Sequence, residues 1–291
     1  MTIQLIAIDL DGTLLSGHTY INETNKAAIR AAQAAGIVVA IATGREHNNV
    51  RSFLETAELV TPVISSNGSV IHDEQKQPMF SLPLARHQAL EVLDWLQKND
   101  YYYQAHTSRG IYTISTGHQL LAVEIDRLLS TNPDPSYLQM LEAMQSMSAK
   151  LKMIRVHTYH EIPDHTDFYN ILALSFEQDK LEVGRKHFDG REDITMVVSG
   201  HMNFEIEHKH ASKGTALQHL AAHYNIPLEQ TMAIGDNFND ISMIQLAGLG
   251  VAMGNAEPEV KAIADEITLT NEQDGVAHAI YKALGMNVPL V

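Results

Sequence analysis

Short apolar runs near the start of the chain predict strands at residues 3–8, 37–42 and 62–66. The first two runs are almost uninterrupted, which suits parallel strands covered on both faces. Between them, the alanine-rich segment 22–35 predicts a helix, with Asn22 or Thr24 as its N-cap and Gly36 as its stop. A strand, a helix and a strand in this order predict a parallel pair joined by a right-handed crossover.

The middle of the chain has a different pattern, in which paired strands and amphipathic helices replace this alternation. We expect a hairpin at 69–73 and 78–82, helices at 85–99, 119–129 and 136–148, a turn or linker at 131–135, and strands at 101–107, 110–115, 169–176, 194–199 and 204–208. This α+β pattern predicts an open-faced sheet with helices on one side.

Alternating strands and helices return after Ser212. The pattern predicts helices at 213–224, 257–264 and 275–284, a helix that ends at 247, and strands at 231–235, 249–253 and 266–269. We therefore predict an α/β protein: a Rossmannoid domain with a parallel sheet, formed by residues 1–82 and 211–291, and an inserted α+β domain at residues 83–210.

Side chains suited to ion binding follow three of the predicted strands. Asp9, Asp11 and Gly12 end the first strand, Thr43 ends the second, and Asp236 follows the strand at 231–235. Ligands of open α/β sheets bind at the carboxyl ends of the strands. Asp9 and Asp11 are two residues apart on an extended segment and point the same way, so together they require a cation. The alternative is an ordinary polar turn after a strand.

These residues suit phosphoryl transfer. Lys213 supplies a cation and Thr43 a hydroxyl beside main-chain N–H groups, which together suit a phosphate dianion. Asp9 and Asp236 offer hard oxygen ligands for Mg²⁺. Asp9 would attack phosphorus to give an aspartyl phosphate, and Asp11 would protonate the leaving oxygen and later deprotonate water.

The motifs Asp9–Thr13, Thr43, Lys213 and Gly235–Asp240, in this order, resemble those of the haloacid dehalogenase superfamily of phosphohydrolases. The segment inserted between Thr43 and Lys213 resembles the C2B type of cap found in its Cof-type branch. The resemblance implies that this cap covers the substrate and supplies its specificity. It also implies further roles: the Asp11 carbonyl as a Mg²⁺ ligand, Leu10, Gly44 and Asn239 as phosphate contacts, Asp240 as the residue that orients the metal ligands, and Asn67-Gly68 as a turn near the site.

Composition narrows the choice of partners and compartment. The chain has 35 acidic and 20 basic side chains, a formal charge of −15, which disfavours nucleic acid and anionic membranes. It has no cysteine, which excludes disulfides, thiolate metal sites and thiol nucleophiles. We expect a cytoplasmic protein because neither a signal peptide nor a membrane span is apparent. The oligomeric state is left open.

Other residue groups favour structural interpretations. The sets His157, His160 and His165 and His208 with His210 lack the spacing of H-E-x-x-H, so they are more typical of solvated or core histidines. Tyr101–Tyr103 and Trp95 are more typical of core packing than of ligand stacking. Residues 250–255 lack the G-x-G-x-x-G spacing of a dinucleotide site. Arg45 suits either a salt bridge or a substrate contact.

The sequence thus predicts a Mg²⁺-dependent phosphatase that acts on a small phosphorylated metabolite, a sugar phosphate or a nucleotide-related phosphate. One alternative is a phosphomutase or phosphotransferase on the same scaffold, which would pass the phosphoryl group to a second hydroxyl instead of water. Another is a regulator that binds a phosphometabolite without turning it over. Asp11 argues against the regulator, since binding alone needs no general acid.

Overall fold

The structure is a computed structural model that describes residues 2–17, 20–131, 136–142 and 153–286. The chain forms two compact units, one of residues Met1–Ser81 and Ala211–Val291 and the other of residues Leu82–His210. The sequence-based boundary placed Leu82 in the first unit instead. None of the described helices is both long and apolar enough to cross a bilayer.

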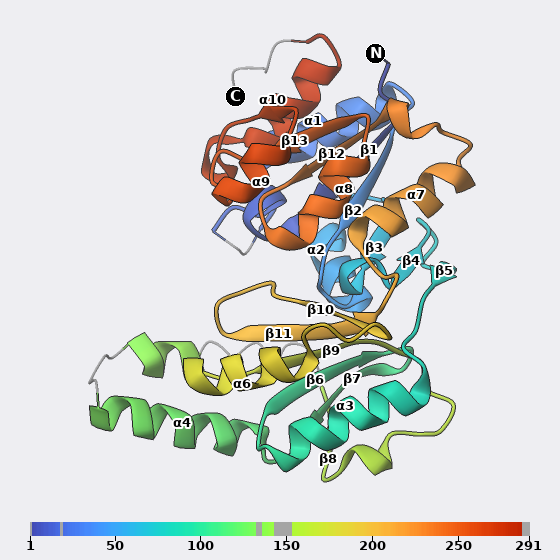
Figure 1. The fold of residues 1–291 in the computed structure, drawn as a ribbon. Coiled ribbons are helices and arrows are strands. Elements are labelled where there is room, and N and C mark those ends of the chain that lie inside the picture. The colour runs from blue at the N-terminus through green and yellow to red at the C-terminus, as the bar shows by residue number, and fades with distance from the viewer. Residues whose placement is uncertain (1, 18–19, 132–135, 143–152, 287–291) are drawn as a thin grey trace. The chain divides into compact units, whose positions relative to one another are not determined.

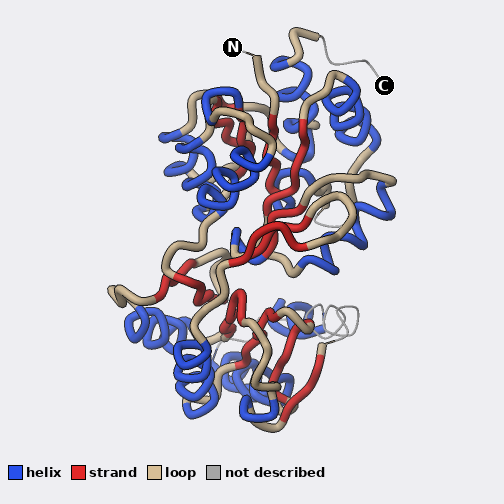
Figure 2. Tube along the Cα trace, turned by 90° about the vertical axis from the view of Figure 1, so that its right-hand side faces the viewer, coloured by secondary structure: helices blue, strands red, loops and turns tan. Residues whose placement is uncertain are grey.

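An eight-stranded sheet forms the centre of the first unit, in the order β14-β13-β12-β1-β2-β3-β4-β5 (Figures 1 and 2). The strands are β1 (Leu5–Asp9), β2 (Val38–Ala42), β3 (Val63–Ser65), β4 (Val70–His72), β5 (Pro78–Ser81), β12 (Thr231–Gly235), β13 (Leu249–Ala252) and β14 (Glu266–Ile267). Pairs from β14 to β3 are parallel, and the β4–β5 hairpin adds antiparallel pairs at one edge. The predicted parallel α/β sheet is confirmed.

Helices cover this sheet on both faces, as the buried strands require. They are α1 (Glu23–Ala34), α2 (His47–Ala57), α7 (Lys213–His223), α8 (Ile241–Leu246), α9 (Pro258–Ile263) and α10 (Gly275–Ala283). In Figure 1, α7 and α8 lie in front of the sheet and α1 lies behind it. The Asn22 side chain accepts a hydrogen bond from the N–H of Asn25 at the start of α1, which confirms Asn22 as the N-cap.

A six-stranded sheet forms the second unit, in the order β10-β11-β9-β6-β7-β8. The strands are β6 (Tyr102–Thr107), β7 (Gly110–Ile114), β8 (Ile154–Val156), β9 (Phe168–Leu174), β10 (Ile194–Val197) and β11 (Asn203–His208). The helices are α3 (Arg86–Lys98), α4 (Gly117–Thr131) and α6 (Gln178–Phe188). Residues 136–142 are also helical, and the rest of the helix and linker predicted at 131–148 lies largely outside the described residues.

The expectation of helices on one face of this sheet was wrong for α4. Buried residues of α3 and α6 pack with Tyr101 and Tyr103, whereas Leu121 and Ile125 of α4 pack with Tyr102. Adjacent residues of a strand point to opposite faces, so α4 lies on the other face. The three tyrosines are buried, which confirms their role in packing and gives both faces an apolar contact.

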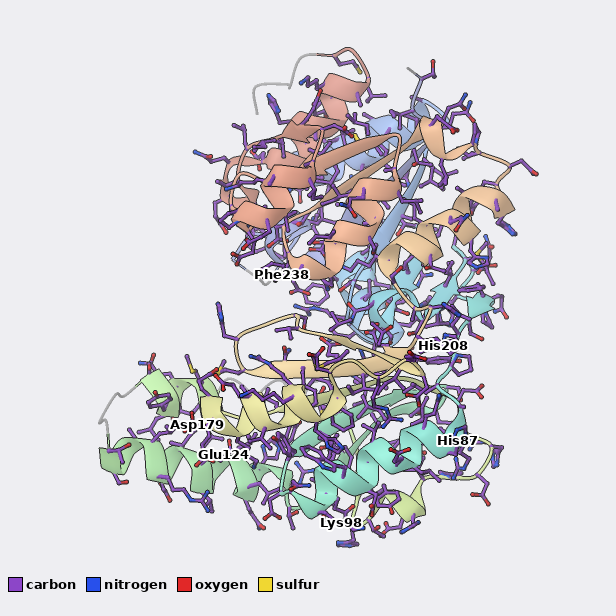
Figure 3. All side chains as sticks on the ribbon, in the orientation of Figure 1. His87, Lys98, Glu124, Asp179, His208 and Phe238 are labelled. Carbon is purple, nitrogen blue, oxygen red and sulfur yellow. The ribbon has the colours of Figure 1, made fainter. Side chains whose placement is uncertain are left out.

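A buried acid ties α4 to the segment that leads into α6. Glu124 of α4, labelled in Figure 3, accepts hydrogen bonds from the Ser175 hydroxyl at 2.9 Å and from the Phe176 N–H at 2.8 Å. Its other oxygen pairs with Lys180 of α6 at 2.7 Å. Burial of a carboxylate is tolerated here because both of its oxygens have donors.

Candidate active site

The residues predicted to act together follow neighbouring strands of the first unit. In the sheet, β12, β1, β2 and β3 are adjacent and parallel, so their carboxyl ends lie at one edge. Asp9 ends β1 and pairs with Ala42, the last residue of β2. Asp236 follows β12 directly. The sheet register therefore brings together the predicted acids and Thr43, which are distant in the sequence.

Lys213 lies between two of these acids. Its Nζ atom is 2.6 Å from Asp9 Oδ1 and 2.6 Å from Asp240 Oδ1, and the lysine side chain is fully buried. Burial alone would lower the pKa of Lys213, but the carboxylates of Asp240 and Asp9 outweigh it and raise that pKa. Lys213 begins α7, where Ser212 is the N-cap and accepts a hydrogen bond from the Thr215 N–H. The ammonium group is therefore charged and fixed.

Asp240 uses both carboxylate oxygens within the protein. Oδ1 pairs with Lys213, and Oδ2 accepts the main-chain N–H groups of Asp236 and Asn237 at 2.9 and 3.0 Å. These bonds hold the turn that carries Asp236. These contacts suit Asp240 to orienting Lys213 and the turn that carries Asp236.

A group of carboxylates fits a hard cation at this edge. One ligand oxygen each from Asp9, Asp236 and Asp240 can be chosen so that all lie within 4.8 Å of one another. Burial raises the pKa of Asp9 well above its usual range, with Asp240 adding to the rise and Lys213 opposing it. Burial also raises the pKa of Asp236, to about 6, with help from Asp240. Crowded, desolvated carboxylates of this kind are stabilised as anions by a divalent cation.

The turn after β1 gives Asp236 a close neighbour. Gly12 has a φ of +80°, and a Cβ at this position would lie 2.4 Å from Asp236 Oδ2. Only glycine combines that backbone conformation with so close an approach. The Thr13 hydroxyl donates to Asp236 Oδ1 at 2.7 Å. The last residues of the Asp9–Thr13 motif therefore shape the surroundings of Asp236.

The predicted phosphate contacts lie in the turns after β1, β2 and β12. Leu10 directly follows Asp9, and Thr43 and Gly44 directly follow β2. The Asn67 N–H donates to the Thr43 carbonyl at 3.0 Å, and the Asn239 Nδ2 donates to Asn67 Oδ1 at 3.0 Å. The structure thus joins the turns that carry Thr43 and Asn239 through Asn67.

The Asn67-Gly68 turn also packs against the start of α7. Gly68 has a φ of +100°, and a Cβ there would lie 2.1 Å from the Ser212 carbonyl oxygen. This approach explains why glycine is required next to Lys213. Phe238, labelled in Figure 3, lies between Asp236 and Asn239 and is 45% exposed.

Arg45 forms an ion pair with Asp11, one of the two roles that the sequence left open. Its Nε and Nη2 atoms donate to Asp11 Oδ2 and Oδ1 at 2.7 and 2.5 Å. The Asp11 side chain is 41% exposed, whereas Asp9 is 4% exposed as a whole residue. The two acids of the motif therefore occupy different environments.

Sequence reasoning missed the part that Asn255 plays. Its Nδ2 donates to the Gly12 carbonyl at 2.8 Å, and its Oδ1 accepts the Asn271 N–H at 2.9 Å. Asn255 follows β13, so a polar residue after a fourth parallel strand was the available signal.

Of the histidine sets, His208 and His210 are adjacent, with the His210 N–H donating to His208 Nδ1 at 3.2 Å.

Known proteins are similar to this chain in sequence and fold. Residues 6–280 match the haloacid dehalogenase-like hydrolase family. The protein named phosphatase YwpJ, from Bacillus subtilis strain 168, is 44% identical over 279 residues, which cover 95% of this chain and 98% of that protein. From the same strain, 5-amino-6-(5-phospho-D-ribitylamino)uracil phosphatase YwtE is 32% identical over 286 residues, covering 97% and 98%. The solved structure of a haloacid dehalogenase-like hydrolase from B. subtilis gives a TM-score of 0.84 at 43% identity, covering 96% of this chain and 99% of that one.

Proposed function

The chain belongs to the haloacid dehalogenase-like hydrolases and is a phosphatase, and from this premise we propose that it hydrolyses a small phosphorylated metabolite with Mg²⁺ through an aspartyl phosphate on Asp9. The observation that carries the proposal is the placement of Asp9. This acid ends β1 in a buried position, 2.6 Å from the Lys213 ammonium and close to Asp236. An ionised carboxylate in such a place is suited to nucleophilic attack.

The phosphate group would meet donors from three turns. Lys213 supplies a fixed positive charge beside Asp9. We assign to Thr43, Gly44 and Leu10 the contacts with phosphate oxygens, and to Asn239 a contact on the side of Asn67. Such preorganised donors stabilise negative charge that develops during transfer.

Mg²⁺ would be held by Asp9, Asp236 and the main-chain carbonyl of Asp11, and would neutralise charge on the phosphate oxygens and on Asp9. The three residues suit this ion because their donors are hard oxygens. Asp240, whose oxygens are both engaged, would keep Asp236 in place.

Asp11 would serve as the acid and base. In the first step Asp9 forms a bond to phosphorus, the bond to the leaving oxygen breaks, and that oxygen takes a proton from Asp11. In the second step Asp11 takes a proton from water, whose oxygen displaces Asp9 from phosphorus. The greater exposure of Asp11 supports contact with water and a leaving group.

We propose that the second unit, residues 82–210, determines substrate specificity. The proposed site residues of the first unit would bind only the phosphate group and the metal, which are common to all phosphomonoester substrates. The proposed substrates are sugar phosphates and nucleotide-related phosphates. The B. subtilis relative whose name gives a phosphoribitylamino-uracil substrate supports this class, since that substrate combines a phosphorylated polyol with a pyrimidine.

A phosphate-release screen tests this function. The enzyme is incubated with a panel of sugar phosphates and nucleotide-related phosphates, once with excess Mg²⁺ and once with excess chelator, and the Asp9→Asn variant is the control. We expect release from at least one compound with Mg²⁺, with none in chelator or from the variant. Equal release in chelator would contradict the metal requirement, and transfer to an added alcohol without release would favour a phosphotransferase.

A further inference from the structure

The ion pair between Arg45 and Asp11 fixes the direction of a carboxylate. Arg45 Nε donates to Asp11 Oδ2 at 2.7 Å and Nη2 donates to Oδ1 at 2.5 Å. Two parallel bonds from a planar guanidinium set the orientation of a carboxylate as well as its distance. A partly exposed side chain would otherwise sample several rotamers. Asp11 is therefore held more firmly than its 41% side-chain exposure suggests.

Arg45 is itself held from three sides. Its N–H donates to the Thr43 hydroxyl at 3.1 Å, and its carbonyl accepts the Ser66 N–H at 3.0 Å. Its guanidinium carbon lies 4.8 Å from the centre of the Phe53 ring, in a cation–π contact with α2. The two main-chain bonds fix the backbone of Arg45 and the Phe53 ring supports its guanidinium, so the side chain loses little further freedom on binding a carboxylate. Asp11 is thus tied to the same turn that carries Thr43.

From this geometry we propose that Arg45 is a positioning residue for catalysis, which holds the Asp11 carboxylate in place for removal of a proton from water. The inference rests on the proposed function, specifically on the roles of Asp9 and Asp11. Arg45 acts through Asp11 and makes no bond to a reacting atom.

The chemistry of the second step explains why this support matters there. After the first step the leaving group has taken the proton of Asp11, so Asp11 is a carboxylate. That is the form to which a guanidinium donates two bonds. Water then gives a proton to Asp11 and its oxygen bonds to phosphorus, while the bond from phosphorus to Asp9 breaks. A carboxylate that turns away from the water slows this step.

A lysine substitution at position 45 tests whether the positive charge of Arg45 is sufficient or whether its two parallel bonds to Asp11 are needed. The Arg45→Lys variant keeps one positive charge but cannot form the parallel pair of bonds. Misplacing a catalytic group by about 1 Å costs on the order of 10- to 100-fold in rate. We expect the rate of dephosphorylation to fall by this factor, whereas the rate of attack by Asp9 should change little.

Rapid-mixing kinetics with 4-nitrophenyl phosphate and Mg²⁺ separate the two steps, because nitrophenolate leaves without protonation. For Arg45→Lys we expect a burst of nitrophenol with a rate constant within about threefold of the parent, followed by a steady-state rate lower by about 10- to 100-fold. Asp11→Asn should give the same pattern with a larger steady-state loss, on the order of 10²- to 10⁴-fold. The steady-state rate of the double variant should equal that of Asp11→Asn alone, because Arg45 acts only through Asp11.

Controls separate this role from a structural one. Arg30→Lys changes an arginine of α1 that bonds to the carbonyls of Ala57 and Glu58, and should leave both rates unchanged. Arg45→Gln gives a second test if the lysine variant folds poorly, since a fall in active enzyme lowers burst amplitude but not the ratio of the two rate constants. If Arg45→Lys lowered the burst rate constant and the steady-state rate equally, or if the losses in steady-state rate multiplied in the double variant, the role of Arg45 would be wrong. The proposed function would still stand. Absence of the burst in Asp11→Asn would overturn the proposed function of Asp11 as well.

Discussion

Lys213 illustrates how single residues of the site depend on one another. A fully buried ammonium is costly unless it is paired, and here two carboxylates lie 2.6 Å from it. Removal of the lysine would leave Asp9 and Asp240 as uncompensated neighbours. The contacts that fix Lys213, which we propose binds phosphate, therefore also hold the first unit together at this edge.

Gly12 offers a matched test of the site at this scale. Alanine at position 12 would place a Cβ 2.4 Å from Asp236 Oδ2, at a φ of +80°, whereas Gly36 has a φ of +81° and nothing within 4 Å of the added Cβ. Both Gly12→Ala and Gly36→Ala should cost about 1–2 kcal/mol in backbone strain. Only Gly12→Ala should weaken Mg²⁺ binding.

Calorimetric titration with Mg²⁺ and denaturant unfolding of both variants check this prediction. We expect Gly12→Ala to lose at least about tenfold in affinity, the loss associated with a disturbed outer coordination shell. Gly36→Ala should bind Mg²⁺ with the affinity of the parent protein. Parental Mg²⁺ affinity in Gly12→Ala would argue against Asp236 as a ligand.

Residues of the site were predictable where they follow strands, and less so where they act through distant partners. Asp9, Thr43 and Asp236 stand at strand ends, which the apolar runs locate. The bond from Thr13 to Asp236 joins positions 223 residues apart, and the bond from Asn255 to Gly12 joins positions 243 apart. No local pattern encodes such pairs, because the order of strands in the sheet creates them.

At the scale of elements, α2 contacts the sheet through two stacked histidines, of which His47 is buried and His72 is half-buried. The ring of His47 stacks on that of His72 in β4, with centroids 3.7 Å apart, and Arg51 lies one turn further along α2. Burial lowers the pKa of His47 to about 3, with His72 and Arg51 adding to the effect. The folded protein therefore resists protonation at this contact.

This contact predicts a pH dependence of stability. The folded-state pKa of His47 is depressed from 6.5, so its contribution to stability is fully present above about pH 6.5 and is lost as the pH falls toward 3. Between about pH 5 and 6.5, the free energy of unfolding of His47→Phe should fall less steeply than that of the parent, by up to ~1.4 kcal/mol per pH unit. Urea unfolding across this range measures both slopes, and identical slopes would refute the assignment.

Elements were predictable where their apolar pattern is regular. The strands of the first sheet were located to within one or two residues, because buried parallel strands are continuous apolar runs. The helix α6 was missed because Leu181 and Phe188 are its only large buried side chains and charged residues fill most of the rest. The strand β8 was missed because it has three residues, two of them exposed. Placement of α4 on the second face depended on Tyr102, whose direction a sequence pattern does not fix.

At the scale of the whole molecule, we propose different functions for the two compact units. The first unit contains the proposed residues for phosphate, metal and proton transfer, and the second is a separate compact unit from Leu82 to His210. Because the insertion leaves the first unit at Ser81 and returns at Ala211, exchange of the second unit leaves every proposed catalytic residue in place.

An exchange of this unit tests its role in substrate choice. We expect a chimera that carries the corresponding segment of the B. subtilis phosphoribitylamino-uracil phosphatase to gain kcat/KM for that compound relative to the parent's preferred substrate. Its activity should still require Mg²⁺ and Asp9. If the chimera keeps the parent's preference, substrate choice resides in the first unit instead.

The central claim is that Asp9 carries the phosphoryl group, and mass spectrometry of acid-quenched enzyme tests it most directly. The Asp11→Asn variant is mixed with a good substrate and Mg²⁺, quenched during turnover, and digested, with borohydride used to convert an aspartyl phosphate to homoserine. We predict a phosphoryl group on the peptide that contains Asp9, homoserine at position 9 after reduction, and neither in samples mixed in excess chelator. Continued turnover with no phosphoryl group on Asp9, or with the group on another residue, would contradict the proposed function.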